Sequence, residues 1–240
     1  MNITVINGTE QKGCTHAMKE IFLSAMGDGH NITEFYLPRD CPVFCTGCKA
    51  CFYRDMSVCT HSQYTVPIWE SIIGADLLVI TSPAYVFSVP GQVKAMLDHF
   101  ATKWMAHSPE KPMFSKQAVI ITNAIGAGMG KTVKCIKDSL DFWGVARVHV
   151  IKQAMFQPKW ELVDDKRKKA VRKKCEKTAT KVNTKRIVKP RLKVKMLFFV
   201  MKKSQTLIDK NERKAGRERT KDYLHWQENG WLDGKKPWKN

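Results

Sequence analysis

The sequence predicts an α/β fold, a three-layer sandwich with a five-stranded parallel sheet and a basic C-terminal extension. Short β-branched runs alternate with segments of helical apolar spacing, which is typical of strands connected by crossover helices. Several of these runs are continuously apolar, as a sheet covered on both faces requires. A strong shift in charge after residue 150 sets the rest of the chain apart.

The expected elements follow one another in a regular order. Five strands are expected at residues 2–6, 32–36, 76–81, 117–122 and 147–151. Helices are expected between them at residues 14–26, 67–74, 91–107 and 130–143. The second helix should open on Pro67, because proline suits the first turn of a helix. After the last strand, residues 162–182 have helical spacing on an otherwise basic segment.

The number of strands and the first loop predict the topology. Five strands with a glycine-containing polar loop after the first favour the flavodoxin-like order 2-1-3-4-5 over a six-stranded dinucleotide-binding fold. In that order the strand sequence reverses between the first and third strands. Ligands of open α/β sheets bind outside the carboxyl ends of the strands at such a reversal. The loops after Ile6 and Thr81 are therefore expected to form the binding site.

Charge divides the 240-residue chain into two parts. Residues 1–150 hold 13 Lys and Arg against 12 Asp and Glu, whereas residues 151–240 hold 28 against 10 and carry nearly all of the net charge of +19. We expect one domain at residues 1–182 and an irregular basic extension at residues 183–240 that contains Trp226, Trp231 and Trp238. The extension has more apolar surface than a solvated tail needs. It is therefore expected to pack on, or exchange between, the subunits of at least a homodimer.

Two further expectations concern partners and location. Basic residues interleave with Phe198, Phe199, Tyr223 and the tryptophans across residues 159–240, so binding of nucleic acid or of an anionic membrane surface is an alternative. A solvated basic face with subunit contacts is favoured over it. No stretch approaches the roughly 20 apolar residues of a membrane-spanning helix, and the first thirty residues do not resemble a secretory leader. The chain is therefore expected to be cytoplasmic.

The loop after the first strand runs directly into a helix. It reads Asn-Gly-Thr-Glu-Gln-Lys-Gly-Cys-Thr over residues 7–15. Glycines permit the turn, threonines offer hydroxyls, and the free N–H groups at the start of a helix favour an anion such as phosphate. An ordinary polar connection, with Cys14 or Thr15 as the helix cap, is an equally weighted alternative when the loop is taken alone.

The loop after the third strand is the most specific part of the sequence. It reads Ser-Pro-Ala-Tyr-Val-Phe over residues 82–87 and continues as Gly-Gln-Val-Lys-Ala-Met-Leu-Asp over residues 91–98. This segment resembles the loop and helix of flavodoxin-like NADPH-dependent FMN reductases and iron–sulfur flavoproteins. Those families have Ser-Pro-x-Tyr, a few small or aromatic residues, and then Gly-Gln-x-Lys-x-Leu/Met-x-Asp. The resemblance covers residues 1 to about 182.

The resemblance implies an FMN site built from three loops. The phosphate is expected at the first loop, where Gln11 replaces the usual arginine, Cys14 replaces asparagine and Lys12 can supply the missing charge. The flavin ring is expected between the second loop, with Tyr85 close to it, and a glycine-rich third loop after the fourth strand. The implied cofactor-binding residues are Thr9, Gln11, Lys12, Gly13, Cys14, Thr15, Ser82, Pro83, Ala84, Tyr85, Val86, Phe87, Asn123, Ala124, Gly126 and Gly128.

Five of the eight cysteines crowd into residues 41–59, which points to metal or redox chemistry in a protein that is not exported. Cys45, Cys48 and Cys51 have two-residue spacing and Cys59 follows seven residues later, so the four thiolates can converge on one centre. The spacing resembles the compact 4Fe–4S motif of iron–sulfur flavoproteins. Three occupants stay open: a 4Fe–4S cluster on these four cysteines, free or redox-active thiols, and zinc with His61 as a ligand.

These features predict an FMN-dependent oxidoreductase that takes a hydride from NAD(P)H and passes electrons to an acceptor that the sequence does not identify. A 4Fe–4S cluster would lie beside the flavin ring and relay electrons, and Cys41 would be a bystander. No catalytic side chain is expected, because the cofactor performs the chemistry and the protein positions it. The other histidines, among them His99, are expected to be structural. A flavin electron carrier without enzymatic activity is the rival prediction.

Overall fold

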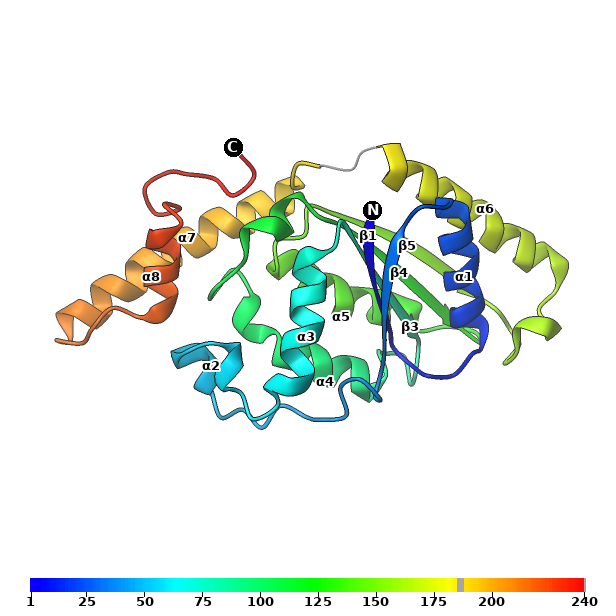
Figure 1. Cartoon of the computed structure of the whole chain (residues 1–240), viewed down its shortest axis with the longest axis horizontal. Coiled ribbons are helices and arrows are strands. Elements are labelled where there is room, and N and C mark those ends of the chain that lie inside the picture. Colours follow the sequence, from blue (N-terminus) through cyan, green and yellow to red (C-terminus); the bar gives the residue numbers. More distant parts are fainter. Residues whose placement is uncertain (185–187, 240) are drawn as a thin grey trace.

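The computed structural model describes residues 1–184 and 188–239, and residues 185–187 and 240 of the expected extension lie outside the described part. Its centre is a parallel five-stranded sheet with the order β2-β1-β3-β4-β5, which confirms the predicted fold class and strand order (Figure 1). The strands are β1 (Asn2–Asn7), β2 (Asn31–Tyr36), β3 (Leu77–Pro83), β4 (Gln117–Ala124) and β5 (Arg147–Ala154).

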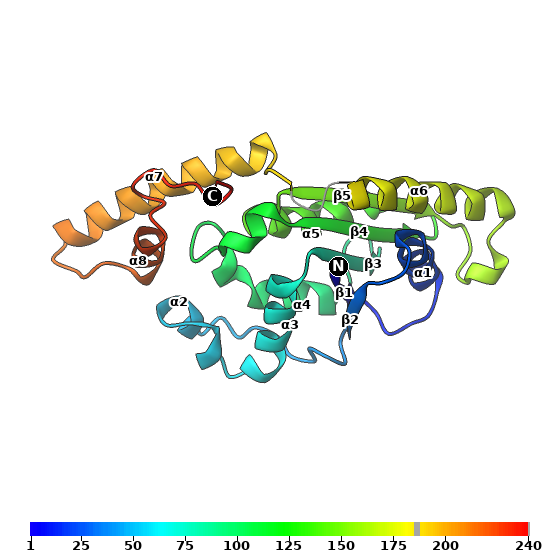
Figure 2. The same cartoon turned by 45° about the horizontal axis from the view of Figure 1, so that its top comes forward.

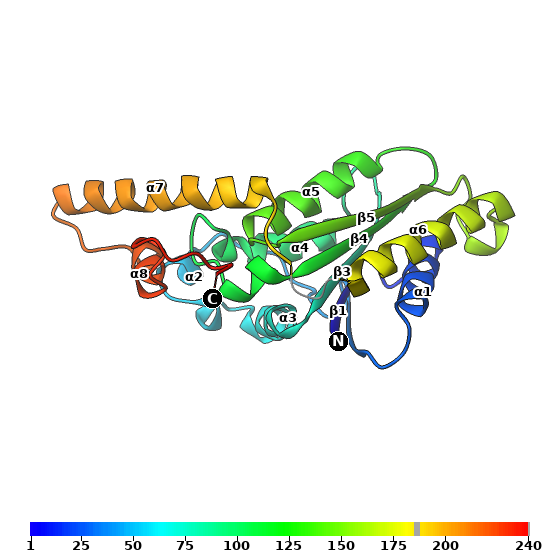
Figure 3. The ribbon, with the colours of Figure 1, turned by 90° about the horizontal axis from the view of Figure 1, so that it is seen from above.

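The central parts of the inner strands are mainly apolar because helices cover both faces of the sheet. In β3, Leu77 and Val79 face one helical layer, whereas Leu78 and Ile80 face the other. The first layer contains α1 (Cys14–Met26) and α6 (Asp165–Thr184), which lie side by side (Figures 1 and 2). The second contains α3 (Ser62–Gly74), α4 (Gly91–His99) and α5 (Met129–Phe142). Seen from above in Figure 3, α5 and α6 lie on opposite sides of β4 and β5.

Shorter helical segments connect these elements. The four-residue helix α2 (Ala50–Tyr53) lies in the cysteine-rich segment between β2 and α3. Single turns of 3₁₀ helix occur at η1 (Met56–Val58), η2 (Ala101–Lys103), η3 (Lys111–Ser115) and η4 (Trp160–Leu162).

Two of the predicted helices have bounds that differ substantially from those in the structure. α3 begins before Pro67, which lies inside the helix and costs it one backbone hydrogen bond. The helix predicted over residues 91–107 ends at His99, because the following turns tighten to hydrogen bonds between residues three apart. This tightening places the buried Phe100 beside Trp69 and Trp143, at ring-centroid distances of 5.1 and 5.9 Å.

The C-terminal extension is mostly helical, so the expectation of an irregular tail is wrong. It contains α7 (Leu192–Lys214) and α8 (Lys221–Glu228), and α7 projects past the end of the sheet at which β5 begins (Figures 1 and 3). The helical spacing could not be recognised in the sequence of residues 196–201, because this apolar run contains both the buried Phe198 and the exposed Met196 and Val200. Within residues 1–184 and 188–239, none of the helices has the length and apolar character of a membrane span.

The extension has a small core of its own. Trp226 and Trp231 are buried against Phe198, and Phe114 of the main domain joins the same cluster. These rings are covered within one chain, so they do not by themselves require a second subunit. Because they are buried, they are also unavailable for stacking on nucleic-acid bases, which removes much of the aromatic surface on which that alternative depended.

A buried carboxylate joins the start of the extension to the domain. Asp141 in α5 accepts hydrogen bonds from Arg191 and from Lys137 Nζ at 2.8 Å, and it lies 2.8 Å from Lys193 Nζ. Burial alone would raise the pKa of Asp141. The hydrogen bonds from Lys137 and Lys193 and the charge of Arg191 outweigh burial, and they hold the pKa below its ordinary value.

The last helix of the extension, α8, forms a hydrogen bond with the cysteine-rich segment. Lys221 Nζ, at the start of α8, donates a hydrogen bond of 3.1 Å to the carbonyl oxygen of Cys51. Next to it, Asp222 Oδ2 lies 2.8 Å from Nδ1 of His107, whose ring packs edge-on against Phe52 at 4.6 Å. The extension is therefore attached to the domain near both of its ends, in addition to the aromatic cluster.

We predict that Asp141→Asn destabilises the protein by about 2–3 kcal/mol, because it leaves three cations without their shared carboxylate. A carboxyl group with a depressed pKa contributes stability above its ordinary pKa of about 3.9 and loses it as the pH falls through the lower folded-state value. The variant should therefore lose less stability than the wild type between about pH 4 and pH 2. Denaturant unfolding at several pH values measures both effects, with the more exposed Asp138→Asn in the same helix as the control. Equal stability of the two variants would contradict this role of Asp141.

Candidate functional site

Three loops converge at the carboxyl edge of the sheet, where the strand order reverses. They follow β1, β3 and β4 and lead into α1, α4 and α5. A cavity opens between them, lined by Thr9, Gln11, Gly13, Cys14, Thr15, Pro83, Ala84, Tyr85, Asn123, Ala124, Ile125, Gln157 and Pro158. This is the crevice in which open parallel sheets bind ligands, as the topology predicted.

Most of the residues expected to bind FMN lie in the wall of this cavity. The expected residues outside the wall are Lys12, Ser82, Val86, Phe87, Gly126 and Gly128. Lys12 is exposed, so the structure does not bring its charge into the cavity to replace the missing arginine. Gln157 and Pro158, from the segment after β5, were not expected, because nothing in their local sequence indicates a binding role.

The α1 end of the cavity is suited to an anion. The N-cap of α1 is Gly13, which has no side chain to accept a hydrogen bond from the first turn of the helix. Within the described part of the chain, the first N–H groups of α1 are therefore available to a ligand. The hydroxyl of Thr15 donates to Asn123 Oδ1 and so joins the first loop to the third. Cys14 contributes through its backbone, because its thiol is buried and lies 3.9 Å from the carbonyl oxygen of Gln157. Burial, with a smaller contribution from the charge of Glu161, raises the pKa of Cys14.

The loop after β3 contains a strained two-residue turn. Tyr85 and Ser88 exchange both backbone hydrogen bonds at 2.9 Å, and Val86 and Phe87 between them have φ values of 47° and 61°. Turns of this type normally contain Asn-Gly, because branched and bulky side chains resist positive φ. Strain of this kind is concentrated at functional sites. Here the turn leaves Val86 94% exposed and Phe87 59% exposed beside the cavity.

The third loop supports this turn through a glycine. Gly128 has a φ of 101°, and a Cβ atom at this position would lie 2.9 Å from Cα of Phe87. Only glycine combines this conformation with such a close approach of two backbones. Gly128 therefore acts by positioning Phe87, although it does not line the cavity itself.

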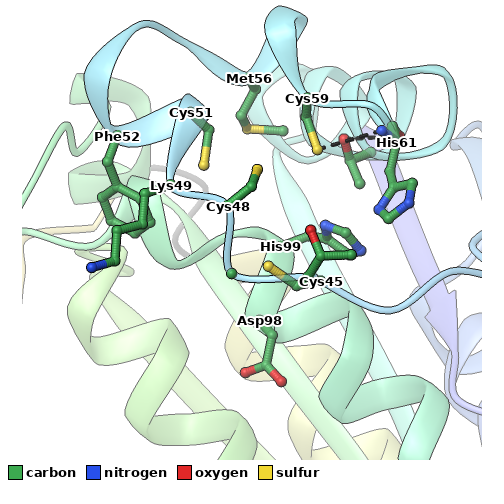
Figure 4. A pocket seen from close by; sticks show the side chains of 13 residues that line it. Cys45, Cys48, Lys49, Cys51, Phe52, Met56, Cys59, His61, Asp98 and His99 are labelled. Carbon is green, nitrogen blue, oxygen red and sulfur yellow. Dashed lines mark hydrogen bonds between the residues drawn. The ribbon is translucent and has the colours of Figure 1, made fainter.

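A second cavity is lined by the sulfur and imidazole groups of Cys45, Cys48, Cys51, Cys59, His61 and His99 (Figure 4). The chain curls around it because Gly47 and Lys49 have positive φ values of 70° and 62°. All eight cysteines of the chain are free thiols. The predicted convergence of the four spaced cysteines on one cavity is therefore observed, and the set fits a group that needs four thiolate ligands.

The electrostatics of this cavity favour a bound cation. Burial raises the pKa of the Cys51 thiol, and the neighbouring Cys59, Cys45 and Cys48 raise it further. Ionising several of these thiols together is unfavourable unless a positive charge lies between them. Cys41 is separate from the set: it is buried in the main core, and burial raises its pKa as well.

The two cavities lie at opposite ends of α4, so the cysteine cavity does not adjoin the cavity in which the flavin is expected. The flavin loop leads into α4 at Gly91, whereas Asp98 and His99 at the other end line the cysteine cavity. The nine residues of α4 span about 13 Å. The cysteine segment leaves the sheet at the carboxyl edge but then continues along the helical layer to α2 (Figure 1).

His99 is the residue of this cavity that the sequence did not indicate. It is the last residue of α4, only 6% of its surface is exposed, and its ring centroid lies 5.2 Å from that of His61. Burial lowers the pKa of His99, and a backbone hydrogen bond with Val43 opposes this shift in part. Its separation from the cysteines along the chain left no spacing that could reveal the contact.

Relatives of known identity agree with this geometry. The family model of NADPH-dependent FMN reductase matches residues 1–161. The iron-sulfur flavoprotein of Methanosarcina thermophila is 24% identical to this chain, over 60% of this chain and 75% of that protein. The FMN-dependent NADH:quinone oxidoreductase of Azotobacter vinelandii is 29% identical over 33% of this chain and 45% of that protein, so this match spans less than half of the relative.

Solved structures of low sequence identity share the fold. An FMN-dependent NADH-azoreductase from Bacillus anthracis in complex with FMN has a TM-score of 0.58 at 14% identity, covering 76% of this chain and 99% of that one. A flavone reductase has a TM-score of 0.58 at 11% identity and covers 98% of both chains, so that the match includes the extension. The family model spans most of the domain that carries the three loops. The chain therefore belongs to the NADPH-dependent FMN reductase family of NAD(P)H-dependent flavin oxidoreductases.

Proposed function

We propose that the protein binds FMN noncovalently in the cavity at the carboxyl edge of the sheet, takes a hydride from NAD(P)H and passes the electrons to a separate acceptor. The observation that carries this proposal is the pairing of an uncapped helix start with a strained apolar turn across one cavity. An anion-binding end beside an apolar rim suits a planar cofactor with one phosphate. FMN supplies the redox chemistry when it is bound.

The residues of the chain bind and orient the cofactor. The N–H groups at residues 13–15 would hold the phosphate, with the side chains of Thr9 and Gln11 beside them. Residues 83–85 and 123–124 form the walls of the cavity. The turn at Val86 and Phe87, supported by Gly128, would offer apolar surface beside a bound flavin.

The acceptor is proposed to be a small planar aromatic molecule. Besides Val86 and Phe87, the exposed apolar side chains near the carboxyl edge include Ile125 and Phe156. Such a surface binds aromatic rings without specific polar contacts. The names of a quinone reductase, an azoreductase and a flavone reductase among the relatives support this class of acceptor.

The free state of all eight cysteines supports a reducing compartment, such as the cytoplasm.

For the cysteine cavity, we propose a 4Fe–4S cluster held by Cys45, Cys48, Cys51 and Cys59. The four thiols line one cavity, and the name of the Methanosarcina relative supports such a group. Because α4 separates the two cavities, a flavin and a cluster in one chain would be held near its opposite ends.

The protein is proposed to form a homodimer through α7. Exposed apolar residues recur along one face of this helix, at Leu192, Met196, Phe199, Val200 and Leu207. An apolar stripe of this length on a projecting helix is typical of a helix that packs against another surface. The apolar surface that predicts a subunit contact is therefore on α7, and the buried tryptophans do not contribute to it.

We predict that the protein purifies with FMN and that NAD(P)H bleaches its visible flavin absorbance. Gly128→Ala should raise the Kd for FMN about tenfold or more, because the added methyl group displaces Phe87. Quenching of FMN fluorescence measures the affinity. Gly74→Ala is the control, since a Cβ atom there meets nothing within 4 Å. A protein that does not bind added FMN would refute the proposal, whereas bound FMN that NAD(P)H leaves oxidised would make the chain an electron carrier.

The proposed cluster leads to a separate prediction about the iron and sulfide content of the protein. Protein purified without oxygen should contain iron and acid-labile sulfide, and Cys51→Ser should remove both while FMN stays bound, because the flavin cavity lies at the other end of α4. Metal and sulfide analysis measures this, with Cys135→Ser in α5 as the control. Iron-free protein after anaerobic reconstitution would exclude the cluster and leave the flavin proposal unaffected.

The dimer is tested by disrupting α7. Phe199→Glu should shift the protein from dimer to monomer, because it places a charge in the apolar stripe. Truncation after Val188 should have the same effect. Sedimentation velocity measures the change, and Thr180→Glu on the exposed side of α6 is the control. A wild-type protein that sediments as a monomer would show that this face does not join two copies.

A further inference from the structure

A second ligand set overlaps the four cysteines. It consists of Cys59, His61 and His99, whose ligand atoms all lie within 4.8 Å of one another. The residues come from three places in the chain: the end of η1, the start of α3 and the end of α4. Figure 4 shows the sulfur of Cys59 and both imidazole rings on the same side of the cavity. Thiolate and imidazole are the ligands that zinc prefers.

His99 is oriented as a metal ligand would be. Among the described residues, none forms a hydrogen bond with its buried Nε2 atom. Histidines that bind metals commonly use one ring nitrogen for a backbone carbonyl, and this leaves the lone pair of the other nitrogen free for the metal.

A structural role for His99 explains this arrangement less well. A buried polar atom without a partner destabilises the folded protein, so side chains that only fill space rarely leave one. The edge-on contact of His99 with His61 accounts for the packing of the rings but satisfies neither lone pair. A ligand in the cavity would satisfy Nε2.

We propose that Cys59, His61 and His99 form a zinc site with an open fourth position in protein that lacks the four-cysteine cluster. The three ligand atoms lie within 4.8 Å of one another, and a zinc ion with Zn–S bonds of about 2.3 Å and Zn–N bonds of about 2.0 Å would draw them closer. Both ligand sets use Cys59, so zinc and a four-cysteine cluster exclude each other. The proposal does not depend on the flavin, whose cavity lies at the other end of α4.

The first test is a zinc titration of the full-length, cluster-free protein, reduced and competing with a chromophoric chelator. We expect one zinc ion per chain in the wild type. His99→Ala should weaken binding by more than about 100-fold, which exceeds the usual effect of losing an outer-shell partner. Cys51→Ser, which belongs to the cysteine set alone, should bind zinc as the wild type does. His30→Ala, on the far side of the sheet, controls for adventitious binding to histidine.

Two results of this titration would overturn the proposal. One is wild-type zinc affinity in His99→Ala, and the other is equal loss of zinc in Cys51→Ser, which would place the ion among the four cysteines. X-ray absorption at the zinc edge tests the wild type without any variant. One sulfur at about 2.3 Å with two imidazole nitrogens at about 2.0 Å supports the site, and a shell of sulfur alone refutes it. Loss of FMN binding in a separate assay would affect the flavin proposal and leave this result valid.

Discussion

The close contact of β1 with β3 at the carboxyl edge determines where both cavities lie. The N–H of Gly8 donates to the carbonyl oxygen of Thr81 at 2.8 Å, and a Cβ atom at Gly8 would lie 2.6 Å from that oxygen. This contact brings the start of α1 beside the loop that follows β3. The same loop fixes where α4 begins, at Gly91, and the length of α4 then fixes where His99 ends up. One strand pair therefore positions the anion-binding helix start and, through α4, one wall of the cysteine cavity.

The strands, the topology and most of the flavin cavity could be predicted because each has a local signal. β3 is apolar at every position that two helical layers cover, and the Ser-Pro-Ala-Tyr segment is specific by itself. The features that the sequence did not reveal depend on distant contacts. Phe198 is buried because α8 folds back and brings Trp226 against it, so the run around it does not look helical in isolation. His99 reaches the cysteines because the length of α4 places its last residue at their cavity, and no spacing in the sequence links it to the cysteine segment.

The extension links the basic part of the chain to the cysteine cavity. Its first turns are held at Asp141, and its last helix donates from Lys221 to the carbonyl oxygen of Cys51. Burial lowers the pKa of Lys221, and the charge of Lys103 lowers it further while Asp222 opposes the shift. Moving a charged ammonium group out of water costs free energy unless it gains a partner in the protein. Lys221 is partly buried and donates to the carbonyl oxygen of Cys51, so we assign it a positioning role. Some of the basic residues of the extension therefore hold it to the domain, and the others give its surface a positive charge.

The ends of two helices suit a cation in the cysteine cavity and an anion in the flavin cavity. The flavin cavity collects free N–H groups at the start of α1, which favour negative charge. The cysteine cavity lies at the end of α4, where the last carbonyl groups give the helix a partial negative charge. Burial raises the pKa of Cys51 there, and the neighbouring thiols raise it further. A metal cation reverses the balance, because it attracts the thiolates, the lone pair of His99 and the helix end together.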